Sequence, residues 1–263
     1  MMANYLEMDP GSFPILPTYI GVAIICAAIT AMLFKRWRER RTRAPALLFL
    51  AFTSYLSCII VLAAGFTEVV VTGYKMELYK FSLAYAYAGF MVAHVFYITF
   101  AWELFSLENR SARGYITACI AVAVLAALPW NHYGQSQSMY SDFNLRPYST
   151  VAILLLTLVV GTRIAYQAFK VSKHVEDPVG KAGFAFIGWS QVLMIVFFAC
   201  MGIDIVVVGL TESQGYTPFN FIGWSAAVLL FIFSYIGLIM PAWVKRRIAE
   251  HALASGTREV DRA

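Results

Sequence analysis

Residues 183–210 read GFAFIGWSQVLMIVFFACMGIDIVVVGL, an apolar run interrupted by a single charged side chain, Asp204. A helix needs about 20 mostly apolar residues to cross the hydrocarbon core of a bilayer, and this run exceeds that length. Similar runs recur along the whole chain. We therefore expect an all-α membrane protein, a seven-transmembrane-helix bundle with spans near 15–34, 46–71, 81–104, 115–130, 148–169, 183–210 and 218–244.

The composition of the chain supports this class. Of its 263 residues, 60% are hydrophobic and 13% are charged, and the mean hydropathy is +0.67. Soluble domains carry about 25% charged residues, so this chain has too little polar surface to face water on all sides. This excludes a secreted disulfide scaffold, a cytosolic enzyme and a disordered regulator. We expect one transmembrane domain over 1–244 and a short basic cytoplasmic tail over 245–263.

The distribution of positive charge predicts the orientation of the bundle. Sixteen of the twenty Lys and Arg residues fall in segments 35–43, 105–113, 170–181 and the tail after 244, which alternate spans place on one side. Only Lys75, Lys80 and Arg146 fall on the other side. Because Lys and Arg are retained in short cytoplasmic loops, we expect the N-terminus outside and the C-terminus in the cytoplasm.

The basic clusters also indicate a partner. Residues 35–43 and 245–247 directly follow apolar runs, where side chains anchor a span in the headgroup layer. Anionic membrane lipids therefore fit these clusters, and no nucleic acid partner is expected. The four cysteines (Cys26, Cys58, Cys119 and Cys200) lie inside apolar runs and lack metal-ligand spacing, so we interpret them as buried, reduced packing residues.

An internal repeat is suggested by two alignments of the chain with itself. A shift of 136 residues places the segment 68–73, EVVVTG, on the segment 204–209, DIVVVG. A shift of 135 aligns the inner ends of the first and fifth spans. Spans one to three would then repeat as five to seven in the same orientation, giving a 3+1+3 parallel repeat with the fourth span as linker.

Two resemblances follow from this plan and from the order of features. The three-plus-one-plus-three topology is similar to that of SWEET and PQ-loop transporters and of opsin-like bundles. The basic first loop, the stretch Phe96 to Leu104, Asn131-His132 and the segment Tyr216 to Gly223 together resemble the N-terminal seven-helix sensor region of prokaryotic membrane histidine kinases. The second resemblance implies a sensory input module in a prokaryotic cytoplasmic membrane.

Polar side chains near the outer ends of the spans are the candidate ligand-binding residues. Glu68 and Asp204 lie about one turn from the outer ends of the second and sixth spans, with Asn220, Tyr85 and Tyr87 at similar depth. Ionisable groups within spans are costly, which makes them functional candidates. Together these residues predict a site for a cation, an amine or a polyol, although two separate interfacial carboxylates would also explain the pattern.

Two further candidates lie deeper. His94 falls at the middle of the third span, either as a neutral side chain bonded to a neighbouring helix or as a residue that senses a proton or ligand. Glu103 and Arg163 lie in the inner thirds of the third and fifth spans, and we expect them to form an inner-leaflet ion pair.

Catalytic and cofactor chemistry is not expected. The chain contains no HExxH, GxSxG, Walker-type or GxGxxG motif, so we predict no enzyme and no metal site. The last span has no lysine to form a retinal Schiff base, and His94 has no second histidine in a span to complete a b-type haem.

The leading functional hypothesis is a receptor-like or sensory integral membrane protein that binds a small extracellular ligand. Because only residues 245–263 follow the last span, we expect it to act through a separate cytoplasmic signalling partner. Two alternatives remain: a small-solute transporter with parallel repeats, and a non-catalytic accessory subunit that associates with other membrane-complex subunits.

Overall fold

The computed structural model describes residues 5–105, 109–133, 143–211 and 216–250, and its regular secondary structure there is helical. A 3-10 turn, η1 (Pro10–Ser12), precedes the long helices. These are α1 (Ile15–Arg40), α2 (Arg43–Thr72), α3 (Glu77–Phe105), α4 (Asn109–Ala127), α5 (Arg146–His174), α6 (Pro178–Thr211) and α7 (Pro218–Ile239). The expected all-α class is confirmed.

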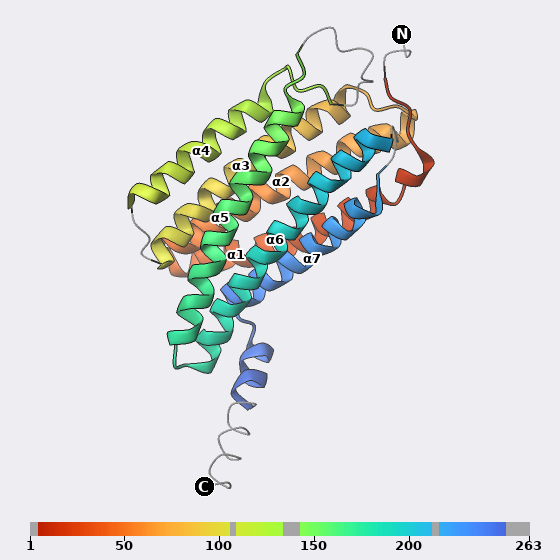
Figure 1. The fold of residues 1–263 in the computed structure, drawn as a ribbon. Helices are drawn as coiled ribbons and strands as arrows, with labels where there is room; N and C mark the ends of the chain where they lie inside the picture. Colours follow the sequence, from red (N-terminus) through yellow and green to blue (C-terminus); the bar gives the residue numbers. More distant parts are fainter. Residues whose placement is uncertain (1–4, 106–108, 134–142, 212–215, 251–263) are drawn as a thin grey trace.

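The helices form one elongated bundle in which each helix packs against the next in sequence (Figure 1). The bundle closes because α1 also contacts α7, while α4 lies at its edge between α3 and α5. We call the end at which α1 begins the N-terminal end. We call the opposite end, which carries residues 35–43, the basic end.

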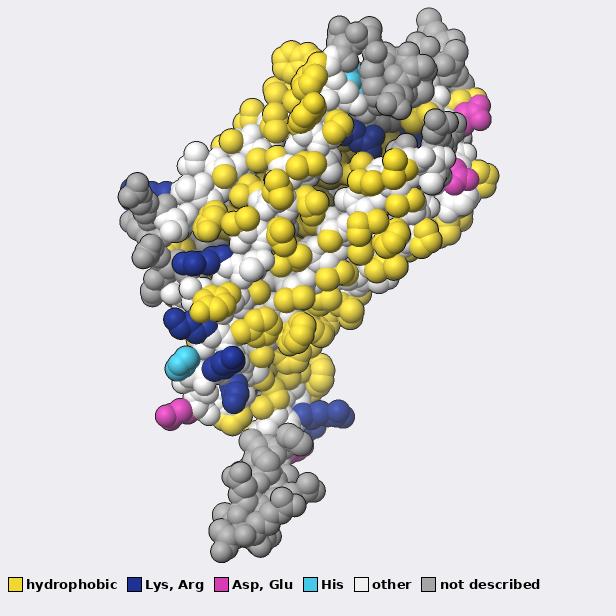
Figure 2. Space-filling view, in the orientation of Figure 1, with side chains coloured by type: hydrophobic (Ala, Val, Ile, Leu, Met, Phe, Trp, Pro, Cys, Tyr) yellow, Lys and Arg dark blue, Asp and Glu magenta, His cyan; other side chains and the backbone are white. Residues whose placement is uncertain are grey.

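Six of the helices are long and apolar enough to cross a membrane: α1, α2, α3, α5, α6 and α7. The apolar part of α4, Ser111–Ala127, is shorter. Hydrophobic side chains cover the flank of the bundle, and Lys and Arg gather mostly toward the end where the chain finishes (Figure 2). Such an apolar flank is what a multi-pass membrane protein presents to lipid. A crossing by α4 and the orientation of the termini remain predictions.

Two helices end before the expected spans do. The fourth span was expected to reach residue 130, but α4 ends at Ala127 because the Asn131 side chain donates to the carbonyls of Leu125 (2.9 Å) and Leu128 (3.1 Å). The seventh span was expected to reach residue 244, but α7 ends at Ile239. Met240 adopts a left-handed conformation with φ 48°.

The break after α7 has a local cause. Pro241 disfavours helical geometry at the residue before it and has no backbone N–H to donate. A second helical segment, 242–250, follows the break. The break leaves carbonyl groups at the end of α7 without their helical hydrogen bonds. Arg36 of α1 satisfies one of them, since its Nη1 donates to the carbonyl oxygen of Leu238 at 2.7 Å.

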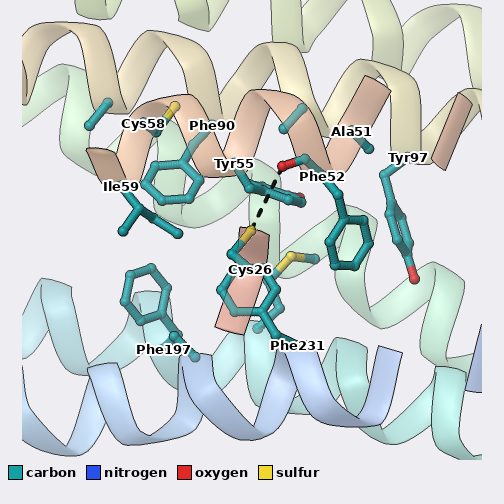
Figure 3. Packing of buried hydrophobic residues seen from close by; sticks show 14 of the residues in the cluster. Cys26, Ala51, Phe52, Tyr55, Cys58, Ile59, Phe90, Tyr97, Phe197 and Phe231 are labelled. Atoms are coloured by element: carbon teal, nitrogen blue, oxygen red, sulfur yellow. Dashed lines mark hydrogen bonds between the residues drawn. The ribbon is translucent and has the colours of Figure 1, made fainter. Parts of the chain in front are cut away.

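The core between the two ends is aromatic. Phe52 and Tyr55 of α2 face Phe231 of α7, with ring centroids 5.8 and 6.1 Å apart (Figure 3). Phe90 of α3 packs against Phe197 of α6 at 6.3 Å. These contacts join α2 and α3 to α6 and α7 across the centre of the bundle. All four cysteines are buried and free of disulfides, as the sequence predicts.

Candidate functional site

A cavity of about 90 Å³ lies among the helices toward the N-terminal end of the bundle. Its walls come mainly from α3, α6 and α7, with contributions from α1, α2 and the first residue of α5. The lining side chains that carry a polar atom are Tyr19, Tyr79, Tyr87, Arg146, Asp204, Tyr216, Asn220 and Trp224. One water needs about 10–15 Å³ measured in this way, so the cavity has room for several waters or one small solute.

Asp204 is the acidic group of this cavity, and α7 holds it in place. The carboxylate is buried and accepts hydrogen bonds from the backbone N–H of Thr217 at 2.7 Å and from its hydroxyl at 2.6 Å. Thr217 is the N-cap of α7, so the charge lies at the positive end of the helix dipole. The Nδ2 of Asn220 approaches the second carboxylate oxygen at 3.4 Å.

Two buried polar atoms on α7 have no hydrogen-bond partner among the residues that the structure describes. They are the Oδ1 of Asn220 and the Nε1 of Trp224, an acceptor and a donor one helical turn apart. Both residues line the cavity and are almost fully buried. Because buried polar groups are normally satisfied, this pair indicates that water or a ligand completes the site.

Aromatic rings surround these atoms. The hydroxyls of Tyr79 and Tyr216 are 2.9 Å apart, and the rings of Tyr19 and Trp224 pack edge to face with centroids 4.8 Å apart. Arg146 adds a cation, with its guanidinium 5.5 Å from the centre of the Tyr133 ring. The cavity therefore presents π faces, one carboxylate and one guanidinium to whatever enters it.

The structure brings together three of the six predicted ligand-binding residues: Asp204, Asn220 and Tyr87. The other three do not line this cavity. Tyr85 is partly exposed, and its hydroxyl donates to Ser57 Oγ at 3.2 Å. His94 is buried deeper, where its Nδ1 lies 2.7 Å from the carbonyl of Phe90 and its Nε2 has no hydrogen-bond partner within the described part of the chain.

Glu68 was expected to share one site with Asp204, but it does not line the cavity that contains Asp204. Glu68 accepts from the backbone N–H groups of Leu78 at 3.3 Å and Tyr79 at 2.9 Å, in the first turn of α3. Glu68 and Asp204 therefore have the same role, because each carboxylate accepts hydrogen bonds from backbone N–H groups at the start of the next helix. This shared role accounts for an acid at both places. The internal repeat itself remains a prediction.

Glu103 was predicted to pair with Arg163, but in the structure it pairs with a different residue. The carboxylate of Glu103 lies 2.9 Å from Nε of Arg43, at the start of α2. Arg163 is exposed and borders a separate space of about 10 Å³ near Ser111 and Tyr115. The two residues therefore face different neighbours.

Sequence reasoning missed five of the lining residues that carry a polar side-chain atom: Tyr19, Tyr79, Arg146, Tyr216 and Trp224. The aromatic residues look like ordinary interfacial side chains in a sequence rich in Phe and Tyr. Arg146 carried the clearer signal, since it is one of only three basic residues expected on the outer side. Its place at the first turn of α5 points it into the bundle only once α5 packs on α3 and α6.

Among the described residues, no group of three or more His, Cys, Asp or Glu side chains is placed to hold a metal ion. Comparison with known proteins yields no matching family model and no significant match to a curated protein or a solved structure. The resemblance to kinase sensor regions therefore stays a prediction from the sequence pattern.

Proposed function

We propose that this protein is a receptor-like, sensory integral membrane protein that binds a small ligand in the N-terminal cavity and acts through a separate partner. The observation that carries this proposal is the unpaired acceptor and donor on α7, Asn220 Oδ1 and Trp224 Nε1, in the wall of that cavity. In the orientation predicted from the charges, the cavity lies toward the outside.

The chemistry of the walls favours a small solute with both a hydrogen-bond donor and an acceptor. A hydroxyl or ammonium group of the solute would donate to Asn220 Oδ1 and lie beside the Asp204 carboxylate. An oxygen of the same solute would accept from Trp224 Nε1. The tyrosine rings would then cover its apolar or cationic surface.

α7 also connects the ligand-binding cavity to the basic end of the bundle. α7 carries both unpaired atoms in its first two turns and ends at Ile239, where Arg36 holds the carbonyl of Leu238. A ligand that shifts the start of α7 relative to α6 would therefore change the contact of α7 with α1. A cytoplasmic partner that binds the basic end would respond to that change.

The experiment is a thermal-shift screen of the purified full chain against small alkylamines, amino acids and polyols. A solute that binds only the folded state raises the midpoint of unfolding by an amount that grows with the logarithm of its concentration over Kd. We expect a stabilising solute for the unaltered protein. Asn220→Leu and Trp224→Phe should each weaken binding of that solute by tenfold or more. Asn220→Leu removes the unpaired acceptor, together with the Nδ2 that approaches Asp204, and Trp224→Phe removes the unpaired donor.

Tyr85→Phe is the matched control, because Tyr85 lies near the same end but outside the cavity. It should leave the shift unchanged. If no solute in the panel stabilises the protein, or if Tyr85→Phe weakens binding as much as Trp224→Phe, the cavity is not the ligand site.

One observation favours the alternative of a small-solute transporter. A second cavity, lined by Phe100, Ile187 and Gly237 among others, opens at the basic end. Phe90 and Phe197 line the N-terminal cavity, while Phe52 and Phe231 line neither cavity. These four rings would act as a gate in an alternating-access cycle. Flux of the stabilising solute into proteoliposomes, absent from empty vesicles, would favour transport over sensing.

A further inference from the structure

The cavity at the basic end is larger than the N-terminal cavity, with a volume of about 390 Å³. It lies among α1, α2, α3, α6 and α7, so that five helices contribute to its wall. This volume falls in the range of about 300–1,000 Å³ that is typical of ligand sites. The proposed sensory function does not use this cavity as a binding site.

Its walls are mostly apolar. Leu48, Phe100 and Ile187 are buried side chains that form part of them, together with Phe184 and Leu238. The close approach of Gly183 and Gly237 brings α6 and α7 together beside it, since a Cβ at Gly237 would lie 2.9 Å from the Gly183 carbonyl oxygen. The interior therefore suits a hydrocarbon group.

Three basic side chains, Arg36, Arg40 and Lys245, also line the cavity. Arg36 is half-buried and fixed by its hydrogen bond to Leu238 O, whereas Arg40 and Lys245 are exposed. The one acidic residue among the described lining residues is Asp177. Its carboxylate is already used, because it accepts from the backbone N–H groups of Gly180 at 2.7 Å and Val179 at 3.3 Å.

We propose that this cavity binds one anionic phospholipid, with an acyl chain along the apolar wall and the phosphate at Arg40 and Lys245. The combination of an apolar wall with a cationic rim matches the two ends of such a molecule. Anionic lipid of the cytoplasmic leaflet adjoins the basic end in the orientation that the charges predict. An acidic protein segment fits less well, since its backbone N–H and C=O groups would be unsatisfied against apolar walls.

The test is native mass spectrometry of the full chain in detergent, with dioleoyl phosphatidylglycerol as probe and dioleoyl phosphatidylcholine as the neutral comparator. We expect one phosphatidylglycerol retained per chain and no equivalent retention of phosphatidylcholine. The double variant Arg40→Gln, Lys245→Gln should bind phosphatidylglycerol roughly 30-fold more weakly, given the usual contribution of each basic residue near anionic lipid.

Two variants separate the cavity from general surface charge. Arg38→Gln, Arg41→Gln removes the same charge from residues that do not line the cavity, and should retain the lipid. Leu104 is a partly exposed residue that lines the cavity. Leu104→Trp keeps every charge but fills part of the cavity, and this variant should lose the lipid. A third arm adds inorganic phosphate in excess, which should not displace the lipid.

Equal retention of phosphatidylcholine, or equal loss in the Arg38→Gln, Arg41→Gln control, would overturn the proposal. So would displacement by inorganic phosphate, because the site would then recognise the phosphate alone. Full retention in Leu104→Trp would show that the acyl chain does not occupy the cavity. A melting curve for each variant verifies that it is folded.

Discussion

Asp204 of α6 and Thr217, the N-cap of α7, are joined by two hydrogen bonds to one carboxylate oxygen. The backbone N–H donates at 2.7 Å and the hydroxyl at 2.6 Å. The two residues belong to successive helices, so this contact sets where α7 begins relative to α6. It also positions Asn220 and Trp224 at the cavity.

Replacing Asp204 should therefore destabilise the protein through the start of α7. Asp204→Ala leaves two donors of Thr217 without an acceptor in a buried place, which costs about 1–3 kcal/mol for each unsatisfied group. Asp204→Asn keeps one acceptor oxygen and should lose less. Thermal unfolding in detergent measures both. Equal stability of Asp204→Ala and the unaltered protein would contradict this role.

The ion pair between Arg43 and Glu103 links the start of α2 to the end of α3 at 2.9 Å. The Arg43 side chain is 75% exposed, so water screens the pair and its coupling should be small, about 0.2–1 kcal/mol. A double-mutant cycle with Arg43→Ala and Glu103→Ala measures it. A parallel cycle with Arg163→Ala should show no coupling to Glu103→Ala, and a coupling there would restore the pairing expected from sequence.

Lys75 gives the protein a pH dependence in the alkaline range. It lies in the short connection between α2 and α3, and burial lowers its pKa from 10.5 to about 8, with the nearby positive charge of Arg146 adding to the effect and Asp9 opposing it. The unfolded chain therefore holds a proton that the folded protein releases between about pH 8 and pH 10.5. Stability should rise with pH across that window, by at most about 1.4 kcal/mol per pH unit.

Lys75→Met removes this titration while retaining an unbranched side chain. The measurement is the difference in unfolding free energy between the two proteins at pH 8 and at pH 10. We expect the unfolding free energy of the unaltered protein to rise relative to that of Lys75→Met between pH 8 and pH 10. A constant difference would mean that Lys75 titrates alike in the folded and unfolded states.

The orientation of the bundle can be tested with single cysteines, because the four native cysteines are buried. Phe143 and Glu176 are exposed positions at opposite ends of α5. An impermeant maleimide added to intact cells should label Phe143→Cys, and should label Glu176→Cys only after the membrane is opened. Labelling of Glu176→Cys in intact cells would reverse the predicted topology.

The apolar runs alone predicted where the long helices lie. Their lengths exceed what a bilayer crossing needs, and little else in a protein demands so many consecutive apolar residues. The position of a polar residue within its run also predicted the depth of its side chain along the bundle, since a straight helix rises about 1.5 Å per residue. Asp204, Asn220 and Tyr87 were placed at one depth in this way, and they do line one cavity.

What the sequence determined was therefore the set of helices and the depth of each polar side chain along them. What only the tertiary structure decided was the direction in which each side chain points. Glu103 faces Arg43 rather than Arg163, and Glu68 turns to the start of α3 rather than to Asp204. The physical reason is that hydropathy fixes the length of a helix in the membrane, whereas its rotation about its own axis depends on packing against neighbours that are distant in sequence.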